Sequence, residues 1–203
     1  MRWVVGSGVA AFVLGFASVA QAAPIVPVSV TASSSYPTYD ASYAVDGNAL
    51  TDWASNSQGA ASTLAIDLGA DYRLASGTFV DRVTSGGPDG SFFGGLYDYT
   101  TSFTLQACTD ASCGTLTGSK LTFDKLAPTV HNSPADFAYT ADLTGLHGQY
   151  FLYSVTGTNG VNPGLSELSF NSVPEAATWA MMIAGVGLAG GALRRRRAGI
   201  AFA

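Results

Sequence analysis

The chain has 203 residues, 11% of them charged, and a formal net charge of −5 at pH 7. Between Ala23 and Val173 there are four basic side chains against thirteen acidic ones, and four further arginines are clustered near the C-terminus. Because so acidic a body repels phosphate backbones, the composition argues against nucleic acid as a partner. The roughly 150 residues of this body are enough for one ordinary domain with its own core.

Residues 1–22 have the features of a secretory signal peptide. A basic start precedes an apolar stretch that runs from Trp3 to Ala20 and ends at the small-x-small pattern AQA. An anchor or a buried helix would also be apolar, but the basic start, the length and the cleavage pattern agree on a signal. We expect signal peptidase to cut after Ala22 and the protein to be exported.

Apolar residues between 25 and 170 come in short alternating runs rather than at helical spacing. The runs are rich in Val, Ile, Thr, Tyr and Phe, and Gly, Pro, Asn, Asp and Ser separate them. No amphipathic helix of three turns precedes residue 174. The sequence therefore predicts an all-β domain, a sandwich or a jelly roll. The runs are IVPVSV, STLAIDLG, GTFVDRV, SFTLQAC, DFAYTADL, QYFLYSVTG and LSELSF.

One long connection, TSGGPDGSFFGGLYDYT from Thr84 to Thr100, is rich in glycine and aromatic residues. Long loops in compact domains are often functional. Its aromatic rings could stack on a sugar, enter a lipid or partner surface, or pack back on their own sandwich, where burial stabilises them most. The candidate ligand-binding residues are Phe92, Phe93, Tyr97 and Tyr99.

Cys108 and Cys113 are the two cysteines of the chain and stand five positions apart in ACTDASC. In an exported protein this spacing predicts a small disulfide-closed hairpin. Two free thiols are the alternative. Metal binding is the weakest interpretation, because zinc would need further ligands nearby.

The densest polar cluster is YAVDGNALTDW, Tyr43 to Trp53. Its Asp-Gly-Asn is a natural tight turn, and composition alone indicates no more than that. Glu167 is the one glutamate of the body, in GLSELSF near its end. Calcium takes six to eight oxygen ligands, and a turn with one distant carboxylate can supply such a set.

Four successive stretches, TASSSYPTYDASYAVDGNALTDWAS, LAIDLG, SFTLQACTDAS and YFLYSVTGTNGVNPGLSELSF, resemble the signatures of a discoidin, or coagulation factor 5/8 type C, domain. That family belongs to the galactose-binding-like jelly rolls and includes the family 32 carbohydrate-binding modules. The resemblance covers about residues 28–171. It implies an eight-stranded β-sandwich with ligand-binding loops at one end, and a structural calcium. The implied metal ligands are the Tyr43 carbonyl, Asp46, Asn48, Thr51, the Ser166 carbonyl and Glu167.

The chain also departs from that family. Where many members carry an Arg-Tyr-Val-Arg run, this chain has QYFLY from Gln149 to Tyr153, and no Arg, His or Asn beside an aromatic platform can be identified. His131 and His147 read as ordinary surface or packed histidines. Because no G-x-S-x-G elbow, H-E-x-x-H motif or phosphate-cradling loop occurs, we expect a binding protein and not an enzyme.

The C-terminal stretch VPEAATWAMMIAGVGLAGGALRRRR resembles the PEP-CTERM sorting signal, in which a Pro-Glu-Pro motif, a transmembrane helix and an arginine cluster end an exported protein. Eighteen uncharged residues, Ala176 to Leu193, give about 27 Å of helix, enough for a bilayer core. We expect a transmembrane helix at about 177–193, with the arginines cytoplasmic. The signal residues are Pro174, Glu175, Trp179 at the interface, Arg194, Arg195, Arg196 and Arg197.

The tail resemblance implies recognition and cleavage by an exosortase, whereas Ala176 in place of the second proline leaves room for a permanent anchor. The sequence thus predicts a signal peptide (1–22), a discoidin-like domain (23–172) and a sorting signal (173–198). We expect an exported, surface-associated, non-catalytic module that binds carbohydrate, such as the cell's own exopolysaccharide. The alternative is a membrane-anchored matrix or adhesion protein that binds other proteins.

Overall fold

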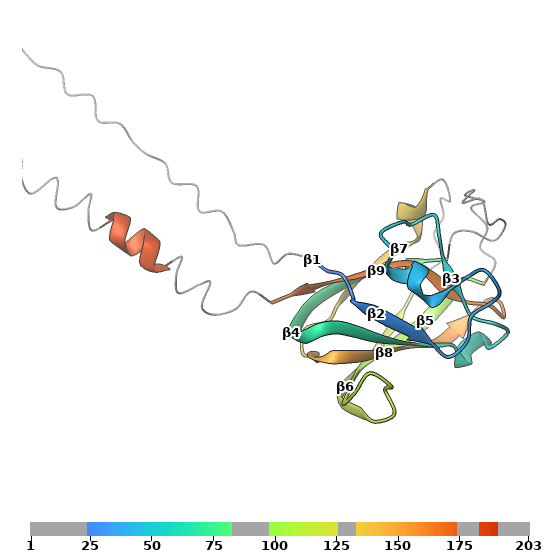
Figure 1. Ribbon diagram of the computed structural model, residues 1–203. Coiled ribbons are helices and arrows are strands. Elements are labelled where there is room, and N and C mark those ends of the chain that lie inside the picture. The colour runs from blue at the N-terminus through green and yellow to red at the C-terminus, as the bar shows by residue number, and fades with distance from the viewer. Residues whose placement is uncertain (1–23, 83–97, 126–132, 174–182, 191–203) are drawn as a thin grey trace, which may run out of the picture. The chain divides into compact units, whose positions relative to one another are not determined.

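The computed structural model describes residues 24–82, 98–125, 133–173 and 183–190 (Figure 1). The expected signal peptide, the sorting-signal residues Pro174, Glu175, Trp179 and Arg194 to Arg197, and most of the expected transmembrane helix lie outside these ranges. Residues 183–190 are helical and exposed. Within the described ranges, no helix has the length and apolar character needed to cross a membrane.

Within the described ranges, the domain contains nine strands and three short 3-10 helices, which confirms the predicted all-β class, although the resemblance implied eight strands. In chain order they are β1 (Pro24–Ile25), β2 (Ser29–Ala32), η1 (Ala41–Val45), β3 (Trp53–Ala54), η2 (Gly59–Ala61), β4 (Thr63–Asp81), β5 (Thr100–Cys108), β6 (Leu116–Asp124), η3 (Pro134–Phe137), β7 (Ala138–Asp142), β8 (His147–Thr158) and β9 (Gly164–Ser172).

The strands form two layers that share β4. Its first half pairs with β2 and β8, and β8 continues to β5 and β6. Its second half pairs with β7 and β9, and β9 also carries β1 and β3. The pairing of β4 with β8 shifts register between Asp67 and Tyr72, where Gly69 has a φ of +79°, and the partner changes from β8 to β9 between Arg73 and Leu74. All these pairings are antiparallel, as in the predicted jelly roll.

Two features of this topology differ from the sequence prediction. Most of the runs STLAIDLG and GTFVDRV lies in one strand, because β4 continues from Thr63 to Asp81 through the register shift. Strand β6 was not predicted, because seven of its nine residues are exposed and the other two are only half-buried, so this edge strand shows no clean apolar alternation.

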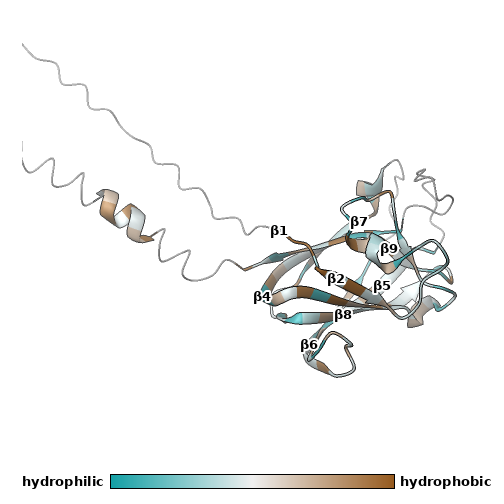
Figure 2. Ribbon diagram, in the orientation of Figure 1, coloured by the Kyte–Doolittle hydropathy of each residue, from teal (hydrophilic) through white to brown (hydrophobic). Residues whose placement is uncertain are grey.

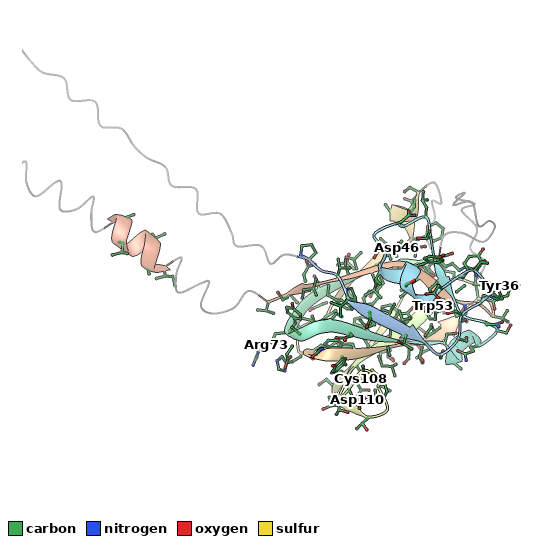
Figure 3. All side chains as sticks on the ribbon, viewed as in Figure 1. Tyr36, Asp46, Trp53, Arg73, Cys108 and Asp110 are labelled. Atoms are coloured by element: carbon green, nitrogen blue, oxygen red, sulfur yellow. A yellow bond between two sulfur atoms is a disulfide. The ribbon has the colours of Figure 1, made fainter. Side chains whose placement is uncertain are left out.

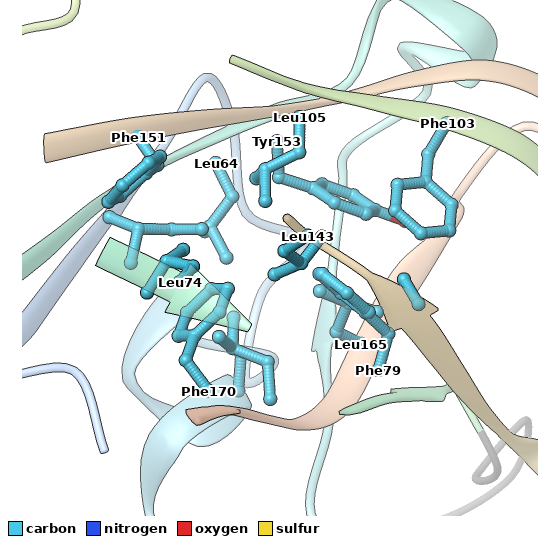
Figure 4. Close-up of a cluster of buried hydrophobic side chains, with 14 of the residues drawn as sticks. Leu64, Leu74, Phe79, Phe103, Leu105, Leu143, Phe151, Tyr153, Leu165 and Phe170 are labelled. Atoms are coloured by element: carbon cyan, nitrogen blue, oxygen red, sulfur yellow. The ribbon is translucent and has the colours of Figure 1, made fainter. Parts of the chain in front are cut away.

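Alternating side chains of the two layers meet in one core. Along the first half of β4, Leu64, Ile66 and Leu68 are buried while the residues between them are partly exposed. Figure 2 shows hydrophobic and hydrophilic bands along β4. Aromatic rings from both layers fill the centre: Phe79 lies 4.8 Å from Phe103 and 5.9 Å from Tyr153, centroid to centroid (Figure 4). Each such ring contributes a large buried apolar area, so the core fixes both layers.

The domain has two distinct ends. At the loop end, β4 stops at Asp81, β5 begins at Thr100, and β9 begins at Gly164 beside β3. At the far end, β5 stops at Cys108, β8 begins at His147, and β9 stops next to β1. Tyr36 and Arg73 mark the two ends in Figure 3.

Candidate ligand and cation sites

The Asp46–Thr51 turn follows η1 and is closed by its own polar side chains. The Asp46 carboxylate accepts a hydrogen bond from the Asn48 backbone N–H (2.8 Å) and one from the Thr51 hydroxyl (2.7 Å). The Asn48 carbonyl accepts from both the backbone N–H and the hydroxyl of Thr51. These bonds orient both carboxylate oxygens of Asp46, which is an exposed residue. Tyr43 lies one turn earlier, in η1.

Strand β9 brings Glu167 to this turn, because β9 packs against η1. Leu165 pairs with Asp81 and Glu167 pairs with Val80, so Ser166 is the extra residue of a β-bulge. The extra residue of a bulge is left unpaired in the ladder, and bulges often re-aim groups beside functional sites. All six residues that the resemblance implied for calcium therefore come from two neighbouring segments.

Glu167 has the character expected of a carboxylate that lacks a counter-charge. Its Oε2 atom is buried and has no hydrogen-bond partner among the described residues, while Oε1 accepts from the Leu168 N–H (3.3 Å). Burial raises the pKa of Glu167, and the charge of Asp46 raises it further, against the backbone N–H groups of Gly47 and Leu168. Two close carboxylates with an unpartnered buried oxygen fit a bound cation.

The described residues hold no cluster of three His, Cys, Asp or Glu side chains. A cation at this turn would therefore depend on carbonyl, amide and hydroxyl oxygens beside its two carboxylates. Calcium accepts such a mixed oxygen set, whereas zinc favours nitrogen and sulfur ligands. The donor chemistry fits the residues named from the sequence.

A pair of tyrosines forms an exposed surface at the loop end. Tyr36 is 44% exposed, and its ring meets that of Tyr39 edge-on at 6.1 Å between centroids. The Arg82 guanidinium lies 4.7 Å from the centroid of the Tyr39 ring. We call Tyr36, Tyr39 and Arg82 the tyrosine surface.

Arg82 is only 8% exposed and is held by groups from three separate segments. Its Nε donates to Asp52 (3.1 Å), and its Nη1 donates to Asp98 (3.2 Å) and to the Asn162 carbonyl (3.1 Å). Asp98 also accepts from the Asn162 N–H at 3.0 Å. Charge-assisted bonds of this kind fix orientation strongly when they are shielded from water. Arg82 therefore fixes the loops that surround the tyrosine surface.

A second buried ion pair lies one residue before Arg82. The Lys125 ammonium contacts the Asp81 carboxylate, which also accepts from the Arg82 and Thr100 N–H groups. Burial raises the pKa of Asp81, against the lowering by Lys125 and these N–H groups. Lys125 also lies 4.7 Å from the centroid of the Tyr99 ring.

Tyr99 corrects one expectation about the long connection. It is 3% exposed and packs with Phe137, so its ring offers no surface to a ligand. Burial, with the Asp81 charge, raises the pKa of Tyr99 to about 12. Tyr99 thus follows the alternative in which the aromatics pack on their own sandwich. The other expected ligand-binding residues, Phe92, Phe93 and Tyr97, lie outside the described residues.

The tyrosine surface was not predicted from the sequence. Arg82 and Tyr39 are 43 positions apart in the chain, so no local pattern pairs them. The available signal was YPTY in SSSYPTYDAS, where two tyrosines flank a turn just before the Asp-Gly-Asn motif.

The cysteines and the described histidine lie at the far end. Cys108 and Cys113 form a disulfide with an S–S distance of 2.08 Å, the pairing expected from their spacing. His147 is an exposed residue whose Nε2 lies 3.0 Å from Asp71, in line with an ordinary surface histidine. His131 is outside the described residues.

These observations define an antiparallel jelly-roll sandwich with loops and polar groups gathered at one end. The protein's fold is similar to that of the family 32 carbohydrate-binding module of Clostridium perfringens NanJ in complex with galactose (TM-score 0.52, 18% identity, 70% of this chain and 91% of that one). It is also similar to a Streptococcus pneumoniae fucose-binding module (TM-score 0.54, 16% identity, 75% and 96%). No curated protein matches the chain.

The family comparisons agree with this fold. The F5/8 type C domain matches residues 29–112, and the PEP-CTERM protein-sorting motif matches residues 172–197. The body of the chain is therefore similar to the F5/8 type C, or discoidin, domain over part of its length, and the tail is similar to the PEP-CTERM sorting motif.

Proposed function

We propose that this protein is an exported, non-catalytic carbohydrate-binding module whose ligand contacts the tyrosine surface. The observation that carries the proposal is the exposed Tyr36 ring beside Tyr39 and Arg82, at the loop end of a discoidin fold. The similar modules from Clostridium perfringens and Streptococcus pneumoniae, described as complexed with galactose and as binding fucose, support a sugar as the ligand class.

The chemistry of the surface suits a sugar. A tyrosine presents an apolar ring face and a polar hydroxyl, and the C–H face of a pyranose can pack on such a ring. The largely buried Arg82 orients the Tyr39 ring, and Asn162 accepts from Arg82 through its backbone carbonyl and from the Ser57 N–H (2.8 Å) through its side-chain Oδ1. Few convergent polar groups beside an aromatic face are typical of small-ligand sites.

The sorting motif supports an exported location for this module. We propose that a signal peptide directs export, that an exosortase processes the tail, and that the domain then acts at the cell surface or outside it. The cell's own exopolysaccharide is the ligand that this location favours.

We further propose that Asp46, Glu167 and the oxygens of Tyr43, Asn48, Thr51 and Ser166 hold a structural calcium ion. The buried, unpartnered Oε2 atom of Glu167 beside Asp46 supports this assignment. The ion would neutralise two close carboxylates and join η1 to β9.

A glycan array with the full-length protein tests the proposed function. We expect binding to one class of glycan and a loss of at least tenfold in affinity for Tyr36→Ala. Tyr150→Ala is the matched control, because Tyr150 is a partly exposed tyrosine on β8 near the far end. Binding that is equally weakened by both variants, or no binding to any glycan with capture of matrix proteins instead, would favour the adhesion alternative.

A further inference from the structure

The four residues Thr51 to Ala54 connect the proposed cation turn to the tyrosine surface. The Thr51 hydroxyl donates to the Asp46 carboxylate at 2.7 Å. The next residue, Asp52, accepts from Arg82 at 3.1 Å, and Arg82 lies over the Tyr39 ring. Thr51, the last residue of the cation turn, is therefore followed directly by Asp52, which positions the tyrosine surface through Arg82.

Trp53 and Ala54 make the second half of this connection. The Trp53 Nε1 donates to the Ser34 carbonyl at 3.0 Å, and the Ala54 carbonyl accepts from the Tyr36 N–H at 2.8 Å. Both contacts fix the backbone that carries Tyr36. Trp53 is fully buried, so this anchor is rigid.

The segment Thr51–Ala54 also pairs with β9, the strand that carries Glu167. Trp53 pairs with Leu165, two residues before Glu167. A Cβ atom at Gly164 would lie 1.8 Å from the Trp53 carbonyl oxygen, so the close approach of β3 and β9 depends on this glycine. Strands β3 and β9 are tightly packed at this point. A shift of Glu167 relative to Asp46 would therefore also move Trp53.

We infer that cation binding between Asp46 and Glu167 orders the tyrosine surface through Thr51–Ala54, with Asp52 as the positioning residue that holds Arg82 against Tyr39. The inference rests on the proposed carbohydrate function for its biological use, and it makes sugar affinity dependent on calcium. By linkage, sugar binding would raise the calcium affinity by the same factor.

Hydrogen–deuterium exchange of the full chain, with and without Ca²⁺ and with no glycan present, tests this coupling. We expect Ca²⁺ to slow exchange severalfold in peptides that cover 43–51 and 164–168, and also in those that cover 34–40. The hairpin 108–113 at the far end serves as an internal control and should not change.

Asp52→Asn separates the coupling from the cation site, since Arg82 keeps its bonds to Asp98 and the Asn162 carbonyl. We expect Ca²⁺ to protect 43–51 as before, but to protect 36–40 less than in the unmutated chain. Protection confined to 43–51 and 164–168 in the unmutated chain would overturn the coupling and leave the cation site intact. No protection anywhere would overturn both, and neither result bears on glycan-array binding, which is measured separately.

Discussion

The loop end and the far end of the sandwich are each stabilised by a different kind of contact. At the loop end, buried charges fix the chain: Arg82 with Asp52 and Asp98, and Lys125 with Asp81. At the far end, a five-residue disulfide loop closes a hairpin, and Asp110 bonds to the Ser112 N–H. Strands β5, β8 and β9 each run from one end to the other.

The two kinds of contact differ in the distance along the chain between the residues that they join. The disulfide joins residues that are already neighbours in the chain, so it stabilises one local turn. The charges join segments that are 16 to 44 residues apart and hold them in fixed directions. Directional, long-range contacts of this kind would suit the ligand surface that we propose, which is assembled from several loops.

Among the variants that test this comparison, Lys125→Met should lower the free energy of unfolding most. It leaves the Asp81 carboxylate, which is fully buried, without its cation. We expect a loss of about 3–5 kcal/mol in the free energy of unfolding, measured by urea denaturation. Lys120→Met is the matched control, because Lys120 is exposed on β6, which ends one residue before Lys125, and its loss should change stability by no more than about 0.5 kcal/mol. Equal effects of the two variants would contradict a structural role for the buried pair.

Removal of calcium should have the next largest effect, again at the loop end. At a hundredfold excess over its dissociation constant, a bound ion adds about 2.7 kcal/mol of stability. We expect a chelator to lower the melting temperature, and Asp46→Asn or Glu167→Gln to abolish the response.

Asp110→Asn is the control for the calcium experiment. Asp110 closes an exposed turn at the far end in the same way as Asp46 closes its own, by accepting from the N–H two residues later. The variant should keep the full response to chelator. If chelator leaves the unmutated protein unchanged, the metal assignment is wrong.

Loss of the disulfide should have the smallest effect, because the closed loop is short. The chain-entropy relation gives about 2 kcal/mol for a loop of this length. We expect Cys108→Ser with Cys113→Ser to lower the melting temperature without changing glycan binding. Alkylation mass spectrometry of the exported protein should find no free thiol. A loss of glycan binding in the double variant would mean that the two ends are not independent.

Local patterns in the sequence were enough to predict most of the strands, the cysteine pairing and the Asp46 turn, since each depends on near neighbours. Two features could not be predicted from such patterns. Strand β6 carries mostly exposed side chains, so it lacks the alternation that marks a half-buried strand. Arg82 and Lys125 are two of only four basic residues in the body, and their acidic partners lie 30 and 44 positions away. Only the folded topology brings them together.

The direction of β9 separates the tyrosine surface from the start of the sorting motif. The strand begins at Gly164 beside Trp53 and ends at Ser172, where β1 also enters. Nine residues of strand span about 26 Å. Because the Tyr36 N–H bonds to the carbonyl of Ala54, next to Trp53, Tyr36 lies at the opposite end of β9 from Ser172, the first residue that the sorting motif matches.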